Sequence, residues 1–143
     1  MDVKIAFLHG DLEEEIYMTQ SEGFKVAGKE NMVCKLEKLL YGLKQSPRQW
    51  YKRFDKFMLW QKYVRSKYDH CVYLCKLKDG SFIYLLLYVD DMLIASKNLV
   101  EIKKLKAQLS KEFEMKDLGD AKKILGMEIT TDRHSKKLYL SQK

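Results

Sequence analysis

The chain has 143 residues, a net charge of +7 at pH 7 and 46% hydrophobic residues. This length suits one domain with a buried core, and the balance of apolar and charged residues excludes a disordered or fibrous chain. Three cysteines are too few for a disulfide framework and favour a reducing compartment. No apolar stretch approaches the roughly 20 residues of a membrane-spanning helix, so no membrane partner is expected. The positive charge fits a polyanionic partner, and equally fits simple solubility.

The first third of the chain is predicted to form short strands. Residues 2–8 have the pattern of a strand that ends in a turn. Residues 15–20 and 31–39 alternate as strands do, and the glycine-containing segment 21–30 between them is expected to be a loop.

A long helix is predicted to begin at Ser46. Serine is a good N-cap, Pro47 suits the first helical position, and Gln49 completes a capping box. A helix of about 18 residues would then present an apolar stripe, which we interpret as core packing. The stripe consists of Trp50, Phe54, Phe57, Met58 and Gln61.

The second half is predicted to alternate between hairpins and one helix. Asp79-Gly80 is a strong turn signal between strands over 70–77 and 81–89, and a further strand covers 92–96. The helix expected over 98–114 has Ile102, Leu105, Leu109 and Phe113 on one face, and a final hairpin joins 122–132 to 137–142. The predicted fold class is α+β, an antiparallel sheet with two helices packed on one side.

Two adjacent acids, Asp90 and Asp91, interrupt the apolar run of residues 82–96. Burial of an unpaired carboxylate is unfavourable, so the pair belongs either in a solvated turn or beside a cation. The apolar flanks predict a central hairpin with the acids at its tip, inside a cleft. Carboxylates are ligands that Mg²⁺ prefers, and a third acid would complete a two-ion site. Asp2, at the start of the first strand, is the candidate third acid.

Four motifs in this order resemble the reverse transcriptase of copia-type LTR retrotransposons. They are MDVKIAFLHGDLEEEIYM, LYGLKQSPRQWYKRF, YLLLYVDDMLIA and MKDLGDAKKILGMEI. The resemblance covers essentially the whole chain. YVDD alone is weakly specific, whereas four motifs with family-like spacing are very specific.

The resemblance implies a polymerase palm-like fold and a set of catalytic residues. Asp2, Asp90 and Asp91 match the three catalytic carboxylates, which would hold two Mg²⁺ ions, with Mn²⁺ as a possible substitute. The carbonyl of Val3 would be a backbone ligand of the metal. Lys116 lies near the position of a lysine proposed to protonate the leaving pyrophosphate, although no strict motif anchors that match.

Further positions are implied to contact the nucleotide, the template and the primer. Phe7 matches an aromatic steric gate against the ribose 2′-hydroxyl, and it could equally be a core residue. Tyr41, Gly42 and Gln45 match the segment beneath the incoming nucleotide and template base, although Gly42 could serve only a tight turn. The primer grip would be Leu125, Gly126 and Met127, where Gly126 could instead be a bulge or a site of close approach in a strand.

The implied reaction is RNA-directed DNA polymerisation, in which a primer 3′-hydroxyl attacks the α-phosphate of a dNTP. The implied partners are an RNA or DNA primer-template, the dNTP and the remainder of a Pol polyprotein. The implied location is intracellular, in a cytoplasmic virus-like particle.

Residues 1–143 would form a single partial domain, the palm from the first catalytic motif through the primer grip. The N-terminal part of the fingers, the thumb and the RNase H domain are expected to be absent, so Asp2 would lie at a terminus that frays unless it is tied down. Two interpretations follow: the palm of an enzyme active only within a longer polyprotein, or an inactive remnant that at most binds nucleic acid. We expect the isolated chain to lack activity.

Overall fold

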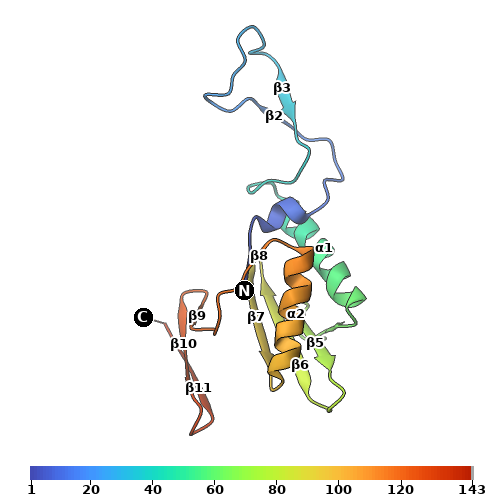
Figure 1. Ribbon diagram of the computed structural model, residues 1–143. Coiled ribbons are helices and arrows are strands. Elements are labelled where there is room, and N and C mark those ends of the chain that lie inside the picture. Colours follow the sequence, from blue (N-terminus) through green and yellow to red (C-terminus); the bar gives the residue numbers. More distant parts are fainter. Residues whose placement is uncertain (143) are drawn as a thin grey trace. The chain divides into compact units, whose positions relative to one another are not determined.

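The chain divides into two compact units, each with one α-helix, in the computed structural model, which describes residues 1–142 (Figure 1). The first unit comprises Met1–Lys4 and the chain from Gln61 onward, and the second is Ile5–Trp60. Helices and antiparallel strands occur together, which confirms the α+β class. Within residues 1–142 the strands form three sheets rather than the one expected. Among the described residues, no helix is long and apolar enough to cross a membrane.

The first unit is built on an antiparallel six-stranded sheet in the order β4-β5-β6-β7-β1-β8. The β6–β7 hairpin lies in the middle of this order, as predicted from its apolar flanks. β5 pairs with one side of the hairpin and β1 with the other, and the edge strands β4 and β8 have two residues each. The strands are β4 (Val64–Arg65), β5 (Val72–Lys76), β6 (Phe82–Tyr88), β7 (Asp91–Ser96), β1 (Asp2–Val3) and β8 (Met115–Lys116).

Strand register separates this sheet into a buried face and an open face. Alternate side chains of a strand point to opposite faces, and cross-strand partners share a face. The buried face is apolar and includes Val3, Tyr73, Ile83, Leu85, Leu87 and Met92. The other face, called the open face below, is more exposed and includes Val72, Leu74, Lys76, Phe82, Tyr84, Leu86, Tyr88, Asp91, Leu93 and Ala95.

Helix α2 (Leu99–Glu112) packs on β7 in this unit (Figure 1). The side chain of Asn98 caps its N-terminus, accepting hydrogen bonds from the backbone N–H groups of Val100 and Glu101 at 3.0 and 3.3 Å. Leu105 and Leu109 are fully buried, and Phe113 after the helix is buried as well. The predicted helix and its inward face are therefore confirmed.

A three-stranded sheet follows: β9 (Lys123–Ile124), β10 (Met127–Asp132) and β11 (Lys137–Ser141). The final hairpin of β10 and β11 is confirmed, but the continuous strand predicted over 122–132 is wrong. Leu125 and Gly126 have φ values of 49° and 79° and form a two-residue turn between β9 and β10. Positive φ at both central residues is the signature of a type I′ turn, for which glycine is well suited.

The second unit begins with a 3₁₀ helix, η1 (Ala6–His9), and contains a separate hairpin, β2 (Tyr17–Thr19) with β3 (Val33–Lys35). The strand predicted over residues 2–8 is therefore wrong beyond Val3. Ile5 has a positive φ of 50°, which turns the backbone out of the strand, and Ala6 and Phe7 are buried in the 3₁₀ turn. Alternation in the sequence cannot distinguish this short buried turn from a strand.

Helix α1 (Ser46–Trp60) is the long predicted helix, with Trp50, Phe54, Phe57 and Met58 buried. It ends before Gln61, so the predicted stripe is one residue too long. The predicted capping box is also wrong. The hydroxyl of buried Ser46 donates to the Leu40 carbonyl at 2.7 Å, and the Gln49 N–H donates to the Gln45 carbonyl at 3.0 Å.

Candidate functional site

The tip of the β6–β7 hairpin holds the acid pair in a two-residue turn. Tyr88 pairs with Asp91 across the strands, so Val89 and Asp90 form the loop. Asp90 lies at the tip as predicted, whereas Asp91 is already the first residue of β7. Val89 has a φ of 53°, and Asp90 is not among the residues with positive φ. This combination matches a type II′ turn, whose first central position favours glycine.

Asp2 lies directly opposite Asp91 on the neighbouring strand β1. The Val3 N–H donates to the Asp90 carbonyl at 2.9 Å, and the Met92 N–H donates to the Met1 carbonyl at 2.8 Å. These bonds flank the pair of aspartates, so Asp2 and Asp91 form a non-hydrogen-bonded pair. Such residues have Cα atoms about 4.5 Å apart and side chains on the same face. The sheet thus joins the first acid to the acid pair.

Lys116 is the cross-strand partner of Asp2 on its other side, in β8. Asp2 is held between two strands, so its backbone is tied down despite its place near the start of the chain. The ammonium of Lys4 contacts the Glu114 carboxylate at 2.8 Å and reinforces the β1–β8 pairing; this hydrogen bond raises the pKa of Lys4. Lys116, Asp2 and Asp91 consequently form a row across one face of the sheet.

The three aspartates have the chemistry of a hard-cation site, but their side chains are not gathered around one point. Each is half-buried. Within residues 1–142, no three His, Cys, Asp or Glu side chains are arranged so that they could hold a metal ion. Like charges directly opposite one another in a sheet are destabilising. Carboxylates are ligands that a divalent cation prefers, and the strand register brings Asp2 beside Asp91, but the side chains do not converge on one point.

A cavity of about 320 Å³ opens beside Asp91, with Met92, Ile94 and Ile102 among its apolar lining residues. Its polar lining includes Lys106, whose ammonium donates to the Asp117 carboxylate at 2.8 Å. That ion pair, with the Gly119 N–H, lowers the pKa of Asp117. The remaining lining residues are Met1, Leu93, Leu118, Gly119, Asp120, Ala121, Lys122, Lys123 and Ile124.

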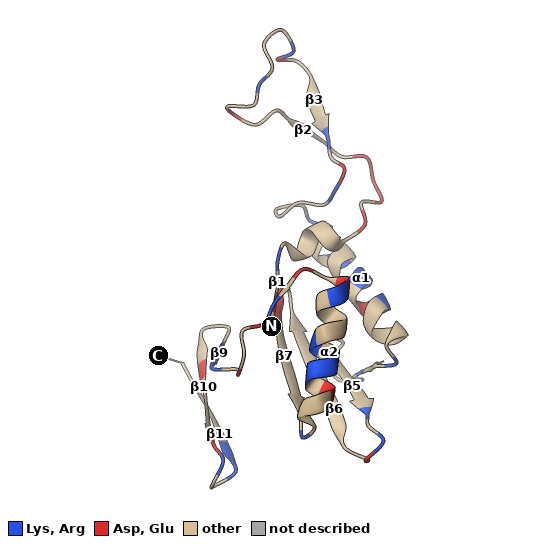
Figure 2. Ribbon diagram, viewed as in Figure 1, with Lys and Arg blue, Asp and Glu red and all other residues tan. Residues whose placement is uncertain are grey.

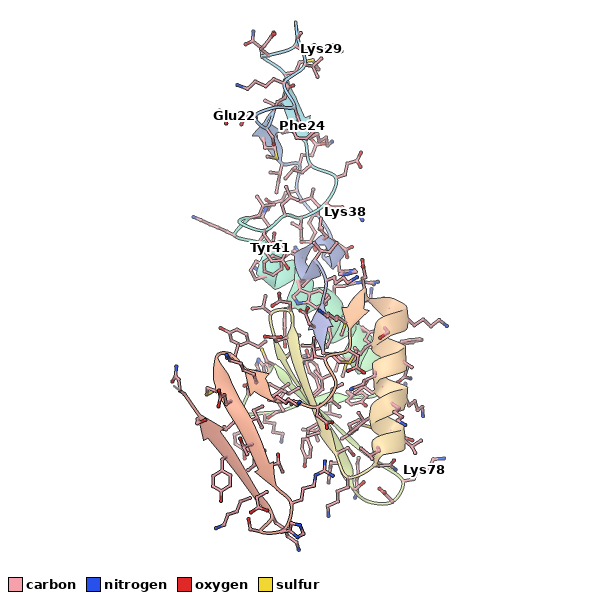
Figure 3. The ribbon with its side chains drawn as sticks, turned by 60° about the vertical axis from the view of Figure 1, so that its left-hand side comes forward. Glu22, Phe24, Lys29, Lys38, Tyr41 and Lys78 are labelled. Atoms are coloured by element: carbon pink, nitrogen blue, oxygen red, sulfur yellow. The ribbon has the colours of Figure 1, made fainter. Side chains whose placement is uncertain are left out.

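Three of the four predicted nucleotide- and template-binding residues lie just before α1: Tyr41, Gly42 and Gln45. The rings of Phe7 and Tyr41 are in contact, with centroids 4.3 Å apart, and Phe7 is buried. Tyr41 is exposed (Figure 3). Gly42 has a φ of 95°, which suits a tight turn. The Gln45 carbonyl accepts the first hydrogen bond of the helix. Whether these residues contact a nucleotide stays a prediction.

The predicted primer-grip residues Leu125, Gly126 and Met127 lie at the β9–β10 turn and the start of β10. Leu125 and Gly126 are exposed and Met127 is half-buried. The bulge considered for Gly126 is replaced by the turn described above. Their contact with a primer stays a prediction.

Sequence patterns missed two features of this site. The strain at Val89 was missed, because valine is an unexpected residue at positive φ. The pairing of Lys116 with Asp2 was missed, because β8 is only two residues long and has no periodic signal. No sequence motif marks either feature.

Comparison with known proteins gives the family of the chain. A family model described as reverse transcriptase (RNA-dependent DNA polymerase) matches residues 1–142. This chain belongs to the reverse transcriptase family. The resemblance to copia-type retrotransposons is thereby confirmed at the level of the family and of its retrotransposon relatives.

Several relatives of this reverse transcriptase segment are Pol polyproteins of transposons. It is 63% identical over 142 residues to the retrovirus-related Pol polyprotein from transposon TNT 1-94 of Nicotiana tabacum. It is 38% identical over 143 residues to that from transposon RE2 of Arabidopsis thaliana. The matches cover 99% and 100% of this chain, but only 11% and 10% of those polyproteins. No solved structure matches the chain.

Proposed function

We propose that this chain is the palm segment of an RNA-directed DNA polymerase, with Asp2, Asp90 and Asp91 as its catalytic carboxylates. The observation that supports this most is the pairing of Asp2 with Asp91 across β1 and β7. These residues are far apart in the sequence, and the sheet places them face to face beside the Asp90 turn. Two carboxylates this close repel each other, and a cation bound between them would offset that repulsion.

The three carboxylates would hold two Mg²⁺ ions, or Mn²⁺ in their place, with the Val3 carbonyl as a backbone ligand. When bound, the ions would supply positive charge that activates a primer 3′-hydroxyl and stabilises the departing pyrophosphate. The protein's contribution is to place the carboxylates on a rigid sheet, so that little reorganisation is needed during reaction. The strained turn at Val89 fixes the direction of Asp90 relative to β7.

Lys116 is proposed to deliver a proton to the leaving pyrophosphate. Its position beside Asp2 supports a role at the same face of the sheet, and its side chain is exposed. Asp2 lies between Lys116 and Asp91, so the ammonium also offsets part of the repulsion between the two carboxylates.

The segments outside the acids are proposed to position the substrates. Phe7 and Tyr41 would contact the ribose and base of an incoming dNTP, with Gly42 and Gln45 beneath the template. Leu125, Gly126 and Met127 would place the primer end. Since the chain spans about a tenth of the polyproteins it matches, we propose that catalysis requires the remainder of a Pol polyprotein. A cytoplasmic particle is the proposed setting.

A chimera tests this proposal. The matching segment of the tobacco polyprotein is replaced by this chain, and extension of a primer on an RNA template is measured beside the unmodified polyprotein. We expect the chimera to extend the primer and the Asp90→Asn chimera to lose nearly all extension. A matched Glu22→Gln chimera, altered at an exposed acid in the β2–β3 loop, should keep it (Figure 3).

An inactive chimera beside an active parent would support the remnant interpretation instead. Extension that persists in the Asp90→Asn chimera would remove the acid pair from the mechanism. Extension by the isolated chain, lost with Asp90→Asn, would show that the remainder of the polyprotein is dispensable.

A further inference from the structure

The open face of the six-stranded sheet has a second feature, at the end of the β6–β7 hairpin away from the aspartates. Phe82 and Tyr84 project from the same face of β6, and their rings stack with centroids 5.9 Å apart and an interplanar angle of 30°. Tyr84 remains 46% exposed. Half-buried Phe82 and exposed Tyr84 therefore present aromatic surface to solvent that a bound ligand would cover.

The rings border a hollow of about 510 Å³ that also involves the last residues of β7. Ala95, the cross-strand partner of Tyr84, leaves room above the sheet because its side chain is small. The hydroxyl of Ser96 donates to the Phe82 carbonyl at 3.0 Å, which fastens the two strands beneath the rings. The remaining lining residues are Gly80, Ser81 and Lys97. The hollow is therefore built on a rigid base.

Positive charge surrounds this hollow. Lys76 is the cross-strand partner of Phe82 on the open face, and Lys97 lines the hollow. Lys78 lies in the β5–β6 turn (Figure 3), where Figure 2 shows basic residues. One acid, Asp79, lies near Lys97 and offsets part of this charge, so the lysines remain in excess. Its carboxylate accepts hydrogen bonds from the Ser81 hydroxyl and N–H at 2.6 and 2.9 Å. The charge around the rings thus favours an anionic ligand.

We propose that Phe82 and Tyr84 form a stacking platform for the bases of a single-stranded nucleic acid, with Lys76 and Lys97 contacting its phosphates. Aromatic rings on a flat antiparallel sheet stack successive bases in many single-strand binders, and lysines track the backbone. The platform shares its face with Asp91, and Tyr84 lies four residues, about 13 Å, along β6 from Tyr88. A nucleic-acid strand bound to the platform can therefore extend toward the aspartates. This inference rests on the proposed function and deepens it.

The test measures binding of a fluorescent single-stranded oligonucleotide of about 12 nucleotides to the full chain by anisotropy, with EDTA present. EDTA makes the result independent of the aspartates, so failure here and failure of primer extension are distinguishable. Tyr84→Leu keeps apolar volume and removes the ring; we expect affinity to fall about tenfold. Tyr84→Trp keeps a ring and should retain affinity within about twofold. Lys97→Gln should weaken binding and reduce its dependence on salt.

Tyr68→Leu is the matched control, because Tyr68 is fully exposed and lies in a turn outside the sheet. It should bind as the unaltered chain does. Equal affinity of the Tyr84→Leu and Tyr68→Leu variants would overturn the platform. Loss of affinity in Tyr84→Trp as severe as in Tyr84→Leu would show that packing, not stacking, is being measured. A change of oligomeric state in Tyr84→Leu with unchanged oligonucleotide affinity would assign the face to a second copy of the chain and overturn the proposal.

Discussion

Val89 is the residue at which the candidate site departs furthest from relaxed backbone geometry. A β-branched residue with positive φ is a genuine outlier, and such strain costs of the order of 1–3 kcal/mol. The turn nevertheless lies between two long paired strands, which together impose it. Strain of this kind concentrates at functional sites, where orientation matters more than stability.

Val89→Gly should therefore stabilise the chain. Glycine removes the strain of the positive φ, while its extra freedom in the unfolded chain costs about 0.5–1 kcal/mol. We expect the free energy of unfolding, measured in urea, to rise by about 1 kcal/mol. Val72→Gly is the control, since Val72 lies within β5 without positive φ and should lose stability. Equal destabilisation by both changes would mean that Val89 is not strained.

At the residue scale, the sequence predicted the acids of the candidate site but not the strain or the strand pairing around them. Asp90 and Asp91 were found because two acids in an apolar run are unfavourable without a reason, and the register then put Asp2 opposite Asp91. The strain at Val89 depends on dihedral angles that no residue pattern reports. The neighbour relation of Asp2 and Lys116 depends on strand pairing across more than a hundred residues, which local periodicity does not encode.

At the scale of elements, one ion pair connects α2 to the segment that follows β8. Lys106 donates to both oxygens of Asp117, at 2.8 and 3.1 Å, and the Gly119 N–H donates to the same carboxylate at 3.0 Å. Lys106 also lines the cavity beside Asp91. The pair therefore helps to hold one wall of the candidate site against the helix.

Lys106→Met should destabilise the chain in a pH-dependent way. The folded-state pKa of Asp117 is lowered by Lys106, so the stabilisation is present above the ordinary value of 3.8 and is lost as pH falls through the lowered pKa. Because the pair is partly exposed, we expect a loss of up to about 1 kcal/mol at neutral pH. The difference in melting temperature between the unaltered chain and Lys106→Met should shrink from neutral to strongly acidic pH. The control Lys103→Met, on the exposed face of α2, should have little effect at any pH. A difference for Lys106→Met that does not change with pH would exclude the ion pair as its cause.

Elements with strong periodicity were predicted well, and short ones were not. The inward faces of α1 and α2 were recovered because large apolar residues recur at helical spacing. The strand predicted over residues 2–8 failed because burial of Ala6 and Phe7 in a 3₁₀ turn gives the same apolar pattern. The strand over 122–132 failed because the Leu125-Gly126 turn takes only two residues within a continuous strand-like pattern.

At the scale of the whole molecule, two compact units carry different parts of the proposed function. The first unit contains the three aspartates, Lys116 and the open face of the sheet. The second contains Phe7, Tyr41, Gly42 and Gln45. The family was recognised from motifs spread over both units, and the family model that matches residues 1–142 agrees. The sequence motifs did not reveal that Asp2 pairs with Asp91. That pairing comes from the strand register in the sheet of the first unit.

The most direct test of the account asks whether Asp2, Asp90 and Asp91 form one cation site. Thermal unfolding of the chain is measured with and without Mg²⁺, for the unaltered chain, for Asp91→Asn and for the exposed-acid control Glu22→Gln. A bound cation stabilises the folded state by about 2.7 kcal/mol at a hundredfold excess over Kd. We predict that Mg²⁺ raises the melting temperature of the unaltered chain and of Glu22→Gln, but not of Asp91→Asn. Without Mg²⁺, Asp91→Asn should be more stable by about 0.2–1 kcal/mol, because it removes the repulsion from Asp2. An equal Mg²⁺ response in all three proteins would contradict the shared cation site.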